Sequence, residues 1–164
     1  MSYLIIIRGP LGCGKTTIAK KLASRIGGKY FSVDRILKKY KLGYDVEDGN
    51  ISQKSFLKTN EVLFPEAKKF LNKNKPVIFD GNFYWKSHIE DLIKKLNVPY
   101  YIFTLHAPLE ICIERDKKRF KTYGVEAAMA VYGRSTALNY GVEIDTTQPI
   151  EHTIKKIITF LPKP

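Results

Sequence analysis

Nine consecutive residues near the start of the chain have the types and spacing that phosphate binding requires. The glycines of this segment let backbone N–H groups turn toward phosphate oxygens, where a Cβ atom would block the approach. We expect Lys15 to contact the β- and γ-phosphates of a nucleotide and the hydroxyl of Thr16 to be a magnesium ligand. The segment matches G-x-x-x-x-G-K-[ST] and predicts a site for ATP or GTP with Mg²⁺, formed by Gly9, Leu11, Gly12, Cys13, Gly14, Lys15, Thr16 and Thr17.

The two cysteines of the chain, Cys13 and Cys112, give no disulfide framework. We interpret Cys13 as a small side chain within the phosphate-binding segment, without a chemical role. The alternative is that the start of the following helix lowers the pKa of the Cys13 thiol and makes it reactive.

Two aspartates follow apolar segments that have the character of strands. Ligands bind outside the carboxyl ends of parallel strands, so we expect Asp34 to face the phosphoryl acceptor and to take the proton of an attacking hydroxyl. The alternative is that Asp34 caps a helix over residues 35–40. Asp80 ends the run Val77-Ile78-Phe79, where a carboxylate is costly without a cation, and we expect it to orient Mg²⁺ and its water shell.

The four residues after Gly81 have two readings. They line the acceptor pocket and hold a base or a sugar there, or they pack in the interior, and the sequence favours neither. These residues are Asn82, Phe83, Tyr84 and Trp85.

Two arginines and a later loop complete the set of candidate residues. Arg115 and Arg119 are four apart, so on a helix they share one face and can stabilise charge on the transferring phosphoryl group. The alternative is that both arginines lie on a surface helix whose charged side chains form salt bridges with one another. Asp145 and Thr146 follow the last expected strand, where a loop can surround the nucleotide base or the phosphate-binding segment, although Asp145 can also serve as a cap.

Strand-like and helix-like segments alternate along the whole chain, which favours an α/β fold with a doubly wound parallel sheet. We find no repeat and no linker, so we expect one domain over residues 1–164. Residues 40–53 show no clear period, and we interpret them as a mobile flap over the site. The expected strands are residues 3–7, 29–33, 76–79, 100–105 and 141–144, and the expected helices are residues 15–26, 56–72 with a possible division at Pro65, 86–96, 109–120 and 150–160.

The chain carries 28 basic and 16 acidic residues, a formal net charge of +12. Much of the excess is lysine in helix-like segments, where it is usually a solvated face, so nucleic acid is possible as a partner but is not favoured. No apolar run approaches the ~20 residues that a membrane span needs. The first residues lack the pattern of a secretory signal, and we expect a cytoplasmic location without a membrane partner.

These features, in this order, resemble those of the adenylate-kinase-like P-loop kinases. The chain is most similar to the small kinases grouped with polynucleotide kinase, zeta-toxin-like and gluconate- or shikimate-kinase-like enzymes. The resemblance covers nearly the whole chain and rests on residues 3–9, Lys15-Thr16, Asp34-Arg35, Asp80-Gly81-Asn82, Arg115 with Arg119, and Asp145-Thr146.

The resemblance implies a three-layer P-loop sandwich with a five-stranded parallel sheet in the order 2-3-1-4-5. It also implies a lid at residues 115–135 and an acceptor flap at residues 40–60. It places Lys15 on the phosphates of ATP, Arg115 and Arg119 in the lid, Asp34 at the acceptor and Asp80 in the position of the Walker B acid.

We therefore expect a kinase that transfers the γ-phosphoryl group of ATP to a hydroxyl of a small molecule, a nucleoside or a polynucleotide end. One alternative is a nucleoside monophosphate kinase, whose acceptor needs no base. The chain departs from adenylate kinases here, because Arg35 is the one arginine found for a flap that would bind a monophosphate. A second alternative is a nucleic-acid-binding protein that uses a nucleoside triphosphate as a switch.

Overall fold

The computed structural model describes residues 1–119 and 123–163, and it is built around a parallel sheet. Five strands form this sheet in the order β2-β5-β1-β6-β7, and every neighbouring pair is parallel. Numbered within the sheet alone, the order is 2-3-1-4-5, as expected. The strands are β1 (Leu4–Arg8), β2 (Lys29–Ser32), β5 (Val77–Asp80), β6 (Tyr100–His106) and β7 (Val142–Asp145), and a separate hairpin joins β3 (Val46–Glu47) to β4 (Asn50–Ile51).

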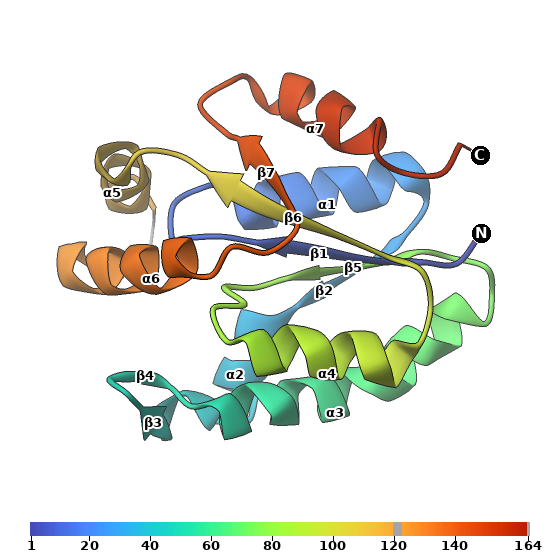
Figure 1. Cartoon of the computed structure of the whole chain (residues 1–164), viewed down its shortest axis with the longest axis horizontal. Helices are drawn as coiled ribbons and strands as arrows, with labels where there is room; N and C mark the ends of the chain where they lie inside the picture. Colours follow the sequence, from blue (N-terminus) through green and yellow to red (C-terminus); the bar gives the residue numbers. More distant parts are fainter. Residues whose placement is uncertain (120–122, 164) are drawn as a thin grey trace.

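Helices cover both faces of the sheet, so that the sheet is the middle one of three layers (Figure 1). Alternate side chains of β1 point to opposite faces. Leu4 and Ile6 pack with α2, α3 and α4, whereas Ile5 and Ile7 pack with α1 and α7. Helices α5 and α6 lie at the end of the sheet toward which the strands run. The helices are α1 (Lys15–Ile26), α2 (Val33–Lys39), α3 (Gln53–Leu71), α4 (Lys86–Leu96), α5 (Leu109–Lys117), α6 (Val125–Ala137) and α7 (Ile150–Ile158), with a short 3₁₀ turn, η1 (Leu42–Tyr44).

Helix α3 is longer than expected, and Pro65 does not divide it. A proline inside a helix removes one backbone hydrogen bond. Pro65 lies on the exposed side of α3, where water can satisfy the freed carbonyl, while Leu63 and Ala67 on the other side are buried in the core. Burial of that face therefore keeps the helix continuous.

The region after β6 differs most from the expected elements. Helix α5 ends at Lys117, so Arg119 lies beyond the helix and does not share its face with Arg115. Phe120, where we expected the helix to end, lies outside the described residues. Helix α6 was not expected, because its sequence VEAAMAVYGRSTA has small or apolar residues on all sides and a glycine within it. The flap segment forms η1 and the β3–β4 hairpin.

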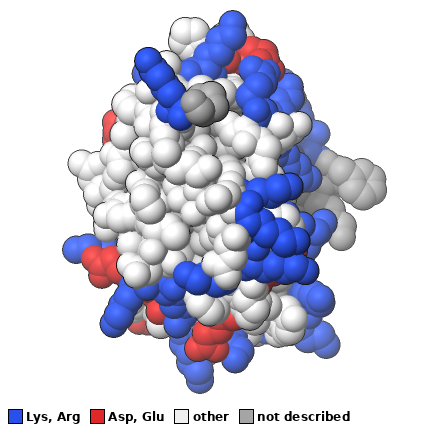
Figure 2. All heavy atoms as spheres, turned by 90° about the vertical axis from the view of Figure 1, so that its right-hand side faces the viewer, with Lys and Arg blue, Asp and Glu red and all other residues white. Residues whose placement is uncertain are grey.

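The side of the molecule with the two chain termini has a broad uncharged area (Figure 2). Lys and Arg gather beside this area and along its edge. A cavity of about 480 Å³ between the strand starts and the C-terminal segment is lined by residues that include Met1, Tyr3, Pro76 and Leu161. No helix in the described ranges has the length and apolar character that crossing a bilayer requires.

Candidate active site

The phosphate-binding segment connects β1 to α1, the context that its pattern requires. Gly14 precedes the first residue of α1 and has a φ of 90°, and Gly12 has a φ of 77°. A Cβ atom on Gly12 would collide with the backbone carbonyl of Cys112. Glycine is therefore required at position 12 both by the turn of the loop and by the close approach of α5.

The loop brings Lys15, Thr16 and Asp80 together at the carboxyl ends of β1 and β5. The Lys15 ammonium is buried and donates to the carbonyl oxygen of Pro10 at 2.7 Å. The Thr16 hydroxyl donates to Oδ2 of Asp80 at 2.7 Å, across 64 positions of sequence. Sequence reasoning expected both side chains at one magnesium site, and the fold places them in direct contact.

Asp80 has a further partner that the sequence did not indicate. The Tyr30 hydroxyl, on β2, donates to the same Oδ2 atom at 2.9 Å. Burial, and then the negative charge of Asp80, raise the pKa of Tyr30 to about 12, so this phenol remains a donor at neutral pH. Oδ1 of Asp80 takes no hydrogen bond from the described residues. A carboxylate oxygen and a hydroxyl are ligand types that Mg²⁺ accepts, together with phosphate oxygens and water, so this pair fits the ion.

Cys13 is completely buried beneath the loop. Its thiol lies 2.9 Å from the carbonyl oxygen of Pro10, which it contacts as a donor. Burial raises the pKa of this thiol, although the nearby Lys15 opposes the shift. Burial thus opposes the alternative in which the start of the helix lowers the pKa of Cys13 and makes its thiol reactive.

Asp34 lies in the first turn of α2 and lines a cavity of about 600 Å³. Ser32, and not Asp34, caps this helix, since its hydroxyl accepts from the N–H of Arg35 at 3.2 Å. Burial raises the pKa of the Asp34 carboxyl above its ordinary value, and the charge of Lys15 opposes this shift. A carboxylate with a raised pKa is a stronger base, which suits a group that takes a proton from an acceptor.

We call the cavity beside Asp34 the flap cavity. Asn82 and Tyr84 line it, whereas Phe83 is fully buried and Trp85 packs against the flap and α6. The Trp85 indole N–H donates to the carbonyl oxygen of Ile51 at 2.8 Å, and the Arg134 guanidinium lies 4.0 Å from the centre of its ring. The four residues after Gly81 thus divide between the two readings. The lining consists of Leu11, Asp34, Leu37, Lys38, Lys41, Gly43, Tyr44, Gly49, Asn50, Ile51, Asn82, Tyr84, Tyr123, Ala127, Ala130 and Val131.

A second cavity, of about 540 Å³, lies between the phosphate-binding loop, Arg115 with Arg119, and the loop after β7, and we call it the base-side cavity. Arg115 and Arg119 both line it. Arg115 donates to the backbone oxygen of Thr146 at 2.7 Å and to its hydroxyl at 3.3 Å. Arg119 lies 3.9 Å from the carboxylate of Asp116. The lining consists of Gly12, Cys13, Gly14, Thr17, Ile18, Arg115, Arg119, Thr146, Thr147, Gln148, Pro149, Ile150 and Thr153.

Asp145 is absent from the residues that line this cavity. It is exposed, and its Oδ1 atom accepts from the N–H of Thr147 at 2.8 Å and from the Thr147 hydroxyl at 2.7 Å. These bonds hold the pKa of the Asp145 carboxyl below its ordinary value. Asp145 thus closes a turn with Thr147 and does not cap α7, whose N-cap residue is Pro149, while Thr146 lines the cavity.

Arg8 is a functional candidate that sequence reasoning missed. It ends β1, immediately before the phosphate-binding loop, and is completely buried. Its guanidinium donates to the carbonyl oxygens of Phe83 at 3.1 Å, Ser135 at 2.9 Å and Leu138 at 3.0 Å, and to the hydroxyl of Thr104 at 2.8 Å. A buried cation at the end of an apolar strand was the available signal. Arg8 joins the start of the phosphate-binding loop to the segment after β5 and to the end of α6.

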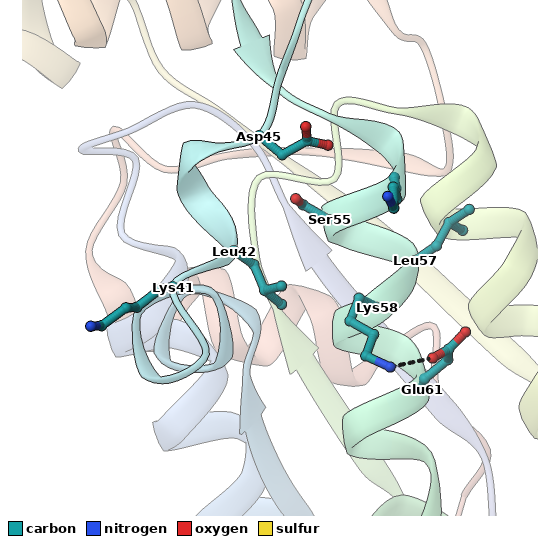
Figure 3. Close-up of a pocket in the computed structure, with 8 residues that line it drawn as sticks. Lys41, Leu42, Asp45, Ser55, Leu57, Lys58 and Glu61 are labelled. Atoms are coloured by element: carbon teal, nitrogen blue, oxygen red, sulfur yellow. Dashed lines mark hydrogen bonds and ion pairs between the residues drawn. The ribbon is translucent and has the colours of Figure 1, made fainter.

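A wider cavity of about 790 Å³ lies between η1 and α3 (Figure 3). None of its lining residues belongs to the phosphate-binding loop. Figure 3 shows the Lys58–Glu61 ion pair along α3, at 3.0 Å, and the Lys41 side chain pointing away from the other lining residues. The phosphate-binding loop instead borders the flap and base-side cavities. This groove is lined by Lys41, Leu42, Asp45, Lys54, Ser55, Leu57, Lys58 and Glu61.

This sheet order, with the phosphate-binding loop between β1 and α1, defines a P-loop fold. A protein-family model described as an AAA domain matches residues 4–137, and the chain belongs to that family.

Individual relatives are named as kinases. The chain is 35% identical over 119 residues to a putative adenylate kinase of Methanocaldococcus jannaschii, a match that covers 70% of this chain and 58% of the relative. It thus spans less than two thirds of that protein's length. A cytidylate kinase of Saccharolobus islandicus is 26% identical over 179 aligned residues, with 96% of this chain and 90% of the relative covered. Among solved structures, a sugar kinase from a Janibacter species has the same fold, with a TM-score of 0.77, 18% identity, and 97% and 94% of the two chains covered.

Proposed function

We propose that this protein is an ATP-dependent kinase that transfers the γ-phosphoryl group to a hydroxyl of its acceptor, with Mg²⁺ as the metal. The observation that carries the proposal is Asp34, a carboxylate with a raised pKa in a cavity that the phosphate-binding loop also borders through Leu11. A hydroxyl has a high pKa and benefits from such a base, whereas a phosphate acceptor is already ionised at pH 7.

The remaining site residues have roles in binding and charge stabilisation. Lys15 would bind the β- and γ-phosphates, and Arg115 and Arg119 would stabilise charge on the transferring group from the base-side cavity. Thr16 and Asp80 would hold Mg²⁺, which neutralises phosphate charge when it is bound. Catalysis of this kind rests on positioning and electrostatics, with little covalent chemistry by the protein.

A nucleoside monophosphate kinase is the second candidate, because two relatives are named as adenylate and cytidylate kinases. The flap cavity supports it less well. Among the described residues that line this cavity the cations are Lys38 and Lys41, without an arginine. Arg35 is exposed and does not line the cavity. Arginine is the side chain best suited to bidentate binding of a phosphate.

Asp34→Asn tests the proposal because it keeps the shape of the side chain and removes its basicity. We expect the variant to fold and to bind ATP, and to phosphorylate its acceptor at least about a hundredfold more slowly. Radiolabelled ATP, offered with nucleosides, monophosphates, 5′-hydroxyl oligonucleotides and sugars, gives the readout. Asp48→Asn is the matched control, in an exposed turn of the flap hairpin. Normal acceptor phosphorylation by Asp34→Asn would favour the monophosphate kinase.

A further inference from the structure

Apolar side chains from four segments line the flap cavity, and such a lining is unfavourable for an acceptor with many hydroxyl groups. Leu11 comes from the phosphate-binding loop, Leu37 from α2, and Val131 from α6, with Ile51 from the flap. Each hydroxyl of a sugar that faces such a wall loses its hydrogen bonds to water without replacement. Small-molecule sites that combine an apolar wall with a few placed polar groups suit ligands with a large apolar face.

Asn82 supplies one of those polar groups, and it lacks a partner. Its side chain is only 8% exposed, and the amide oxygen Oδ1 is buried with no hydrogen bond among the described residues. Buried acceptors in native proteins are nearly always bonded, so an unpaired one in a cavity wall points to a donor brought by a ligand. A ligand that satisfies this oxygen would carry an N–H or O–H group in addition to the hydroxyl that we propose to face Asp34.

Among the described residues, the flap cavity has two lining cations, Lys38 and Lys41. The Lys38 ammonium donates to the hydroxyl of Tyr123 at 3.2 Å and lies 5.5 Å from the centre of the same ring. This contact raises the pKa of Lys38 and engages its charge with an aromatic side chain of the same cavity. Neither lysine offers a phosphate the bidentate contact of a guanidinium, and Lys38 is already engaged with Tyr123, which favours an uncharged acceptor.

We propose that the acceptor is a neutral nucleoside, a planar ring joined to a group that carries hydroxyls. The proposal rests on the hydroxyl-kinase function above. The ring packs against the apolar wall beside Tyr84, and one N–H or O–H of the nucleoside donates to Oδ1 of Asn82. The hydroxyl oxygen attacks the γ-phosphorus of ATP, the bond from that phosphorus to the β,γ-bridging oxygen breaks, and Asp34 takes the hydroxyl proton. The products are a nucleoside monophosphate and ADP.

The first experiment compares acceptors with radiolabelled ATP and Mg²⁺. The probes are the four common nucleosides with their deoxy forms, the corresponding monophosphates, and gluconate and glucose. We expect at least one nucleoside to be phosphorylated with a kcat/KM more than about tenfold above that of its monophosphate and of either sugar acceptor. If a sugar is phosphorylated and no nucleoside is, this proposal is wrong and the hydroxyl-kinase function stands. If only monophosphates react, both are wrong.

The second experiment tests Asn82 itself. Asn82→Leu keeps the volume and removes the acceptor oxygen, and losing one such bond corresponds to roughly a tenfold rise in the KM for the nucleoside. The KM for ATP should stay within about twofold, which separates acceptor binding from general damage to the site. Lys58→Ala, in the neighbouring groove of Figure 3, is the control and should leave both KM values unchanged. A nucleoside KM that does not change in Asn82→Leu would overturn the role given to this amide.

Discussion

Replacing the buried Arg8 with lysine is a small chemical change that should lower the free energy of unfolding substantially. Arg8→Lys keeps the positive charge, but an ammonium is a single point and cannot reach acceptors that a planar guanidinium contacts from three nitrogens. If two of the four acceptors lose their donor, and each buried unpaired acceptor costs ~1–3 kcal/mol, the free energy of unfolding should fall by roughly 2–6 kcal/mol.

Thermal melting gives the first measurement of this effect. For a chain of this size 1 kcal/mol corresponds to ~2–4 °C, so we expect the melting temperature of Arg8→Lys to fall by roughly 10 °C. Urea denaturation should show the same loss as a lower midpoint. Arg25→Lys is the matched control, because Arg25 is half exposed and pairs with Glu151 at the surface, where such pairs contribute little. A melting temperature of Arg8→Lys within about 2 °C of the wild type would refute the reasoning.

Three further predictions concern single groups. Asp80→Asn should raise the Mg²⁺ concentration needed for nucleotide binding, measured by titrating Mg²⁺ at fixed ATP; an unchanged midpoint would leave Asp80 with a structural role only. Burial lowers the pKa of His88 to about 3, so between pH 6.5 and 3 the unfolded chain takes up a proton that the folded chain does not, and stability falls as the pH is lowered. From pH 7 to 5 the wild type should lose ~2 kcal/mol more than His88→Phe in urea titrations, and equal losses would contradict this. Cys13 should alkylate slowly with or without ATP, and rapid labelling of the folded protein would show that the loop opens.

The sheet and the phosphate-binding loop could be predicted because their signals are local. The glycines, Lys15 and Thr16 form a contiguous pattern. The three apolar runs, residues 3–7, 76–79 and 100–105, needed no long-range information to be recognised as strands. The partners of Asp80 are different. Thr16 is visible in the loop pattern, but Tyr30 reaches the carboxylate from another strand, and nothing in the residues around Tyr30 indicates that contact.

The lid region could not be predicted for a related reason. Helix α6 begins where the buried Asp116 carboxylate accepts from the backbone N–H groups of Tyr123 and Gly124. Backbone N–H groups are the same for every residue type except proline, so the sequence cannot indicate that they bind Asp116. From the sequence alone, Asp116 is interpreted as one of several charges on a surface helix. The same holds for Arg8, three of whose four acceptors are backbone carbonyls.

The two hydroxyls on one oxygen of Asp80 have a consequence for metal selectivity. Because Thr16 and Tyr30 both donate to Oδ2, this carboxylate can offer a cation only Oδ1 as a well-placed ligand. The hydrogen of the Thr16 hydroxyl is committed to Asp80, so the lone pairs of that oxygen remain for a cation. Ca²⁺ commonly takes both oxygens of a carboxylate in a large coordination shell, whereas Mg²⁺ needs single oxygens in a compact octahedron. We therefore expect a cation site formed by Asp80 and Thr16 to favour Mg²⁺ over Ca²⁺.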